Sequence, residues 1–122
     1  MLRIMSYPIH IMKKLIGGNM DFSLEEKVVG TWIDGKPLYQ RAFQGNVANG
    51  LVLDDSGTIE NLICQFGYCN YDSTHPSHIL PLTSTNNLFV DVTSTNNLQL
   101  RNSGWGNNRP FVFVCMYTKT ID

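Results

Sequence analysis

Two cysteines and two histidines near the middle of the chain have the residue types and spacing closest to a metal site. Cys64, Cys69, His75 and His78 form the pattern C-x4-C-x5-H-x2-H, and thiolate and imidazole groups are the usual ligands of structural zinc. The spacing fits no common zinc module well. Cys64 and Cys69 also lie five residues apart in a stretch with strand character, which places their side chains on opposite faces. We therefore expect packed thiols and loop histidines, with no metal or other cofactor. A small zinc-dependent protein is the weakest alternative.

The sequence contains no recognisable catalytic motif. It has serines, histidines and aspartates, but no G-x-S-x-G, no compact Cys/His motif and no pair of carboxylates in a supporting context. Neither Gly17-Gly18 nor Gly104-Trp105-Gly106 has the spacing of a phosphate-binding loop or a helix after it. We expect a protein that is not an enzyme.

Aromatic rings, amides and charged groups gather in two predicted loops, residues 67–77 and 101–109. An aromatic ring can stack on the apolar face of a sugar while amides and carboxylates hydrogen-bond its hydroxyls. The alternative is that Trp105 folds back over the core and Asn107-Asn108 only make the turn. Asn and Gly are favoured at loop tips because they tolerate the φ angles that turns require. The candidate ligand-binding residues are Tyr68, Tyr71, Asp72, Trp105, Asn107, Asn108 and Arg109.

Short β-strands must position these loops, because the sequence after Met20 shows little helical periodicity and many Gly, Asn, Asp and Ser breaks. A chain with seven to eight short strands favours an all-β fold, an antiparallel β-sandwich or jelly roll, here after an irregular N-terminal segment. The predicted strands cover residues 28–33, 36–43, 51–53, 58–66, 88–92, 98–101 and 111–118.

Local signals predict several turns. Asp34-Gly35 between β-type segments indicates a hairpin with a type I′ turn, in which both central residues have positive φ. The run Thr-Ser-Thr-Asn-Asn-Leu occurs at 83–88 and again at 93–98, and this spacing of ten suits successive antiparallel strands with similar Asn-Asn turns. One helical turn is expected at 23–27, where a serine precedes two glutamates.

The last predicted strand is apolar on both faces. Phe111, Phe113, Cys115 and Tyr117 alternate with Val112, Val114 and Met116. Such a strand must be covered on both sides, either by two sheets or by one sheet and another subunit. The candidate subunit-contact residues are Trp32, Phe111, Val112, Phe113 and Val114.

Length and charge limit the other possibilities. A chain of 122 residues is the size of one domain, which we expect to cover 20–122 after a leader or linker remnant at 1–19. A short docking helix or strand is the alternative for 1–19. Nine basic and ten acidic residues give no cluster of positive charge that could bind nucleic acid or an anionic membrane.

The cysteines and the first residues bear on where the protein folds. Three cysteines do not form an even disulfide set, so folding in a reducing cytoplasm fits best. Pro8, His10 and Lys13-Lys14 interrupt the early apolar run, so neither a signal peptide nor a membrane-spanning helix is expected.

The two ends of the predicted domain resemble a C-terminal domain of tailed-phage and prophage structural proteins. Residues 24–40, LEEKVVGTWIDGKPLYQ, are similar to the opening S-x-E-E-x-V-V-G-x-W-I-D-G-K-P-[LI]-Y-x-[KR] of those domains. Residues 117–122, YTKTID, are similar to their ending Y-T-K-T-x-D, and NSGW at 102–105 resembles a loop with tryptophan before the last strand. The resemblance implies a virion part made in the bacterial cytoplasm, at the tip of a tail fibre, baseplate or minor structural protein. It implies a homo-oligomer, commonly a trimer, and no catalytic residues.

Two functions follow from this resemblance. The first is an oligomeric tip module that binds a host-surface glycan through its loops. The second is a purely structural trimerisation or capping domain with no ligand.

Overall fold

The computed structural model of the protein describes residues 21–70, 78–83, 86–104 and 108–120. Within these ranges the protein is all-β, as predicted, with nine strands and no helix. Seven strands match the predicted ones, and the two short strands β5 and β6 were not predicted. The strands are β1 (Lys27–Thr31), β2 (Pro37–Asn46), β3 (Val52–Asp54), β4 (Ile59–Cys69), β5 (His78–Leu80), β6 (Leu82–Thr83), β7 (Asn87–Val92), β8 (Leu98–Ser103) and β9 (Pro110–Lys119).

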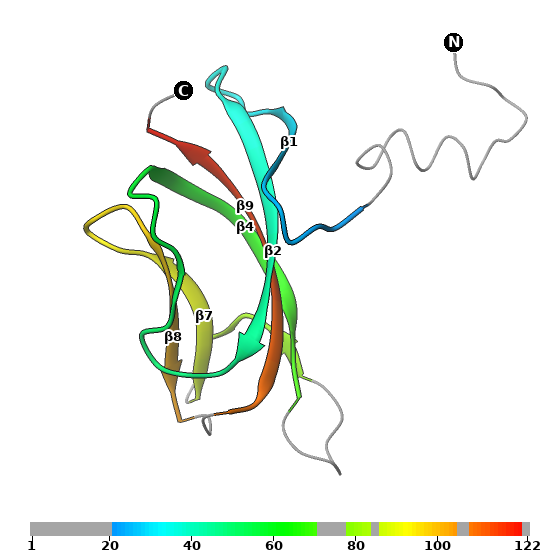
Figure 1. Ribbon diagram of the computed structural model, residues 1–122, viewed down its shortest axis with the longest axis vertical. Coiled ribbons are helices and arrows are strands. Elements are labelled where there is room, and N and C mark those ends of the chain that lie inside the picture. Colours follow the sequence, from blue (N-terminus) through cyan, green and yellow to red (C-terminus); the bar gives the residue numbers. More distant parts are fainter. Residues whose placement is uncertain (1–20, 71–77, 84–85, 105–107, 121–122) are drawn as a thin grey trace, which may run out of the picture.

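Two antiparallel sheets face each other as a β-sandwich (Figure 1). One has five strands in the order β1-β2-β9-β4-β5, and the other has four in the order β3-β8-β7-β6. The C-terminal strand β9 lies between β2 and β4 in the five-stranded sheet, although both of these strands come early in the chain. The ends of β2, β4 and β9 are therefore brought together by pairing across long stretches of sequence.

The alternation predicted for the last strand is present in β9. Phe111, Phe113, Cys115 and Tyr117 are at most 2% exposed and lie in the core between the two sheets. Val112 and Met116 are half-buried on the opposite side of the sheet, which we call its outer face. The four-stranded sheet completes the core with alternate apolar residues, namely Leu88, Val90, Leu98 and Leu100.

Two of the five predicted subunit-contact residues lie in the core of the single chain. Phe111 and Phe113 are 2% and 0% exposed because they fill the space between the chain's own sheets, so they offer no side-chain surface to a second subunit. Val114 is 5% exposed, whereas Trp32 and Val112 are half-buried. A contact through these last three residues stays a prediction.

Two three-residue turns have the same hydrogen bonds. In the β1–β2 turn, Gly35 N donates to Trp32 O (2.9 Å) and Trp32 N donates to Lys36 O (2.8 Å). In the β7–β8 turn, Asn96 N donates to Thr93 O and Thr93 N to Asn97 O, both at 2.9 Å. Each turn has one residue with positive φ, which is Gly35 at 90° and Asn96 at 63°. The hairpin at Asp34-Gly35 was therefore predicted correctly, but its type I′ geometry was wrong, because Asp34 does not have positive φ.

The segment before β1 bends at Leu24 and Glu25 and does not form the predicted helical turn. Ser23 Oγ accepts a hydrogen bond from Glu25 N (3.0 Å), but Ser23 O accepts from Ala42 N of β2 (2.8 Å). Glu26 is then held by Tyr117, whose hydroxyl donates to it (2.7 Å), and by Lys119 (2.6 Å). These contacts with β2 and β9 replace the local bonds of a helix.

Candidate functional site

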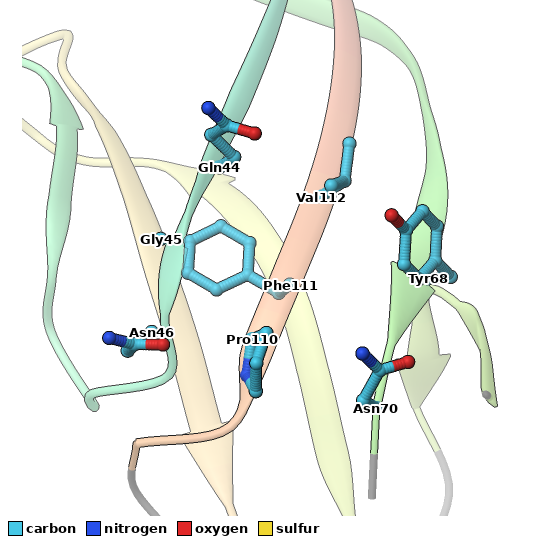
Figure 2. Close-up of a pocket in the computed structure, with 8 residues that line it drawn as sticks. All are labelled: Gln44, Gly45, Asn46, Tyr68, Asn70, Pro110, Phe111 and Val112. Carbon is cyan, nitrogen blue, oxygen red and sulfur yellow. The ribbon is translucent and has the colours of Figure 1, made fainter. Parts of the chain in front are cut away.

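An open hollow lies at one end of the five-stranded sheet, where β2 and β4 flank the start of β9 (Figure 2). Its volume is about 450 Å³, which is within the usual range for small-molecule sites. Figure 2 shows amide side chains from β2 on one side of β9, and a tyrosine and a further amide on the other. The described lining residues are Gln44, Gly45, Asn46, Tyr68, Asn70, Pro110, Phe111 and Val112.

Strand register places the main side chains of the hollow in one row. Gln44 pairs with Val112, and Val112 pairs with Tyr68 on its other side. Residues in register on neighbouring strands project from the same face of a sheet, so all three side chains lie on the outer face. Asn70 follows β4 directly, and its backbone N donates to Pro110 O (3.0 Å). This bond holds the ends of β4 and β9 together.

The middle of the hollow is shaped by two residues next to each other across β2 and β9. A Cβ atom on Gly45 would lie 3.5 Å from the Phe111 ring, so the ring packs directly against the β2 backbone. Phe111 itself is 2% exposed and is fixed by the core. The hollow therefore has a rigid base, which lowers the entropic cost of binding.

The chemistry of the hollow is neutral and suited to hydrogen bonding. Gln44, Asn46 and Asn70 each carry a primary amide, which can donate and accept hydrogen bonds. The Tyr68 side chain adds an aromatic ring in a residue that is 44% exposed. No described lining residue carries a charge, a thiol or an imidazole. Such a site can hold an uncharged, hydroxyl-rich ligand.

The predicted ligand-binding residues divide into three groups. Tyr68 is in the hollow, but it lies on β4 and not in a loop, because this strand continues through Gly67 to Cys69. Asn108 and Arg109 lie beside it, where Asn108 N donates to Val47 O and Arg109 O accepts from Val47 N, both at 2.8 Å. The remaining four lie outside the described residues, and their roles stay predictions. They are Tyr71, Asp72, Trp105 and Asn107.

Sequence reasoning missed the amides that complete the hollow. Gln44 and Asn46 are far from Tyr68 in the chain, and only the pairing of β2 and β4 with β9 brings them near it. The local sign of a polar site was the run Gln44-Gly45-Asn46 after a predicted strand. Such residues are also common where a strand simply ends in a turn, so they did not indicate a site.

The residues of the zinc alternative are brought together only in part, because Cys69 and His78 are register partners across β4 and β5 while Cys64 lies on the other face of the sheet. Cys64 is exposed on the outer face, whereas Cys69 is buried. Burial raises the pKa of the Cys69 thiol, and the nearby positive charge of Arg109 partly opposes this rise. His75 lies outside the described residues, and the described part of the chain has no group of three or more potential metal ligands.

Apolar side chains form a patch on the outer face, next to the hollow. We define the outer patch as Phe22, Cys64, Phe66 and Met116. Cys64 pairs with Met116 across β4 and β9, and the Phe22 ring packs edge-on against Phe66 with centroids 5.8 Å apart. Phe22 is 49% and Phe66 38% exposed. The described residues therefore leave this part of the sheet only partly covered.

A second groove, of about 420 Å³, lies between β2 and β3. Its lining is mainly apolar, with Leu24, Phe43 and Leu51 among its members. Arg41 is fixed there by Asp54 (3.6 Å) and by the Phe43 ring, whose centroid is 4.8 Å away. Because Arg41, the one cation among the described lining residues, is already engaged, this groove is a weaker candidate for a ligand site.

Comparison of the chain with protein-family models, curated protein sequences and solved structures returned no match. Across the described ranges, no helix has the length and apolar character needed to cross a membrane.

Proposed function

We propose that this protein is a non-enzymatic tip module of a phage or prophage tail structural protein, which binds a neutral sugar of the host surface in the hollow. The observation that carries this proposal is the meeting of the Tyr68 ring with three side-chain amides in one uncharged hollow. The similarity of residues 24–40 and 117–122 to the ends of phage structural domains supports the class and the location in the virion.

The binding mechanism follows from the lining. A pyranose stacks its apolar face on the Tyr68 ring, and the amides of Gln44, Asn46 and Asn70 exchange hydrogen bonds with its hydroxyls. An open hollow of this kind binds a single sugar weakly. Several copies on one tail fibre make the attachment strong, because each further contact is intramolecular and gains from a high effective concentration.

A glycan array tests the proposal. The native chain, displayed in several copies on a bead, is expected to bind a subset of neutral glycans, and Tyr68→Ala is expected to lose this binding. Ile33→Ala is the matched control, because Ile33 is 91% exposed in the turn at the opposite end of β2. Equal binding by the native chain and Tyr68→Ala, or no binding to any glycan, would contradict the proposal.

The second candidate is a purely structural trimerisation or capping domain with no ligand. The outer patch favours it, because exposed apolar surface on a sheet is typical of protein contacts. This function predicts a trimer in light scattering and no glycan binding. A monomer at every concentration would contradict it.

A further inference from the structure

The outer patch lies where the first twenty residues join the described chain. Phe22 packs on Phe66 of β4, and the Gln40 amide of β2 donates to Asp21 O (3.4 Å). Gln40 is in register with Met116, a member of the outer patch. Asp21, the first described residue, therefore lies directly beside this patch.

The described residues cover the outer patch only in part. Phe22 and Phe66 are 49% and 38% exposed, and Cys64 is exposed beside them. Removing apolar side chains from water is favourable in proportion to the area covered. An attached segment can cover such a surface with a smaller entropic loss than a separate molecule, because it is already held nearby.

Residues 1–20 have the composition and charge for this role. Ten of these twenty residues are Met, Leu or Ile, and three are basic while none is acidic. The other 102 residues carry six basic and ten acidic side chains, so the segment and the domain have opposite net charge. Twenty residues can reach about 60 Å when extended, whereas a five-stranded sheet is only about 20 Å across.

We propose that residues 1–20 pack on the outer patch of the same chain and cover Phe66 and Cys64. Val112 and Tyr68 lie between this patch and the rest of the hollow. The proposal does not depend on sugar binding.

Cys64 provides a direct probe of this contact. Burial keeps the other two thiols from reacting, and it raises the pKa of Cys115 to about 12. A maleimide added to the folded full-length chain therefore reports on Cys64, with the modified peptide identified by mass spectrometry. We expect Ile9→Asp combined with Ile11→Asp to speed this reaction by about tenfold or more. The two aspartates weaken the apolar contact, so Cys64 is uncovered in a larger fraction of the molecules and reacts faster in proportion.

Ser6→Asp combined with His10→Asp is the matched control, because it adds two acidic groups to the same segment without removing an apolar side chain. This variant should react at about the native rate. Continued protection of Cys69 and Cys115 shows that each variant is folded.

Three outcomes would overturn the proposal. The native chain could react as fast as the Ile9→Asp, Ile11→Asp variant, or both double variants could react at one rate. Protection of Cys64 in the native chain could also disappear on dilution, which would identify a second copy as the cover. Protection that is independent of concentration and lost only in the Ile9→Asp, Ile11→Asp variant supports the proposal.

Discussion

Gln65 and Val90 exchange two hydrogen bonds across the two sheets of the sandwich. The Gln65 amide of β4 donates to Val90 O (2.9 Å), and Val90 N of β7 donates to Gln65 Oε1 (2.7 Å). Strand β6 pairs with β7 only at Leu88 and Asn87, so it does not reach Val90. The glutamine side chain takes the place of a neighbouring strand at this edge.

Replacing Gln65 by leucine should lower the free energy of unfolding. Val90 is 2% exposed, so its N–H and C=O would be left without partners, at about 1–3 kcal/mol for each buried group. Urea denaturation measures the loss. Gln44→Leu on the outer face is the matched control and should change stability by less than about 0.5 kcal/mol. Equal stability of Gln65→Leu and the native chain would mean that these bonds contribute little.

Gly67→Ala should destabilise the fold. A Cβ atom at this position would overlap the Val112 carbonyl oxygen of β9, and a backbone atom in the middle of a sheet cannot move aside easily. We expect a loss of about 1–3 kcal/mol in urea denaturation. Gly30→Ala in β1 is the control, because nothing lies within 4 Å of its added Cβ. Equal stability of the two variants would show that β4 and β9 can move apart at Gly67 at little cost.

Stability should fall at alkaline pH because of Tyr117. Burial, followed by the hydrogen bond to Glu26, raises the pKa of Tyr117 above its ordinary value of 10. Above pH 10 the unfolded chain loses this proton while the folded chain keeps it. The stabilisation is therefore complete below pH 10 and decreases above it by about 1.4 kcal/mol per pH unit.

Urea denaturation at a series of pH values compares the native chain with Tyr117→Phe. The variant should be less stable at pH 8, where Glu26 loses a donor, but its stability should fall less steeply above pH 10. Burial also raises the pKa of Cys115 to about 12, which adds a similar decrease to both proteins from about pH 9 upward. Parallel curves for the two proteins would show that Tyr117 is not the group that titrates.

Sugar binding in the hollow should depend little on salt. The described lining residues carry no charge, and a contact between neutral groups is not screened, so affinity should vary by less than about twofold from low to high salt. Gln44→Glu should weaken binding by about tenfold, since the donor of one hydrogen bond is lost. A strong salt dependence, or tighter binding of acidic than of neutral glycans to the native chain, would identify an anionic ligand instead.

The amino-acid sequence by itself determined the class of fold and most strand positions. Asp34-Gly35, the repeated Thr-Ser-Thr-Asn-Asn-Leu run and the alternation in 111–118 each act locally, because turns and two-sided strands depend on the residues present at that place. The errors were also local. Residues 23–27 form no helical turn because β2 and β9 bind them, and the hairpin has positive φ only at Gly35.

Only the tertiary structure decided which strands are neighbours and what they bring together. Pairing of β9 with β2 and β4 joins Gln44 to Tyr68 in the hollow, and packing of the sheets joins Gln65 to Val90. Each of these pairs is far apart in the chain. The physical reason is that such contacts are selected by the free energy of the whole core, whereas a turn or a strand is favoured by its own few residues.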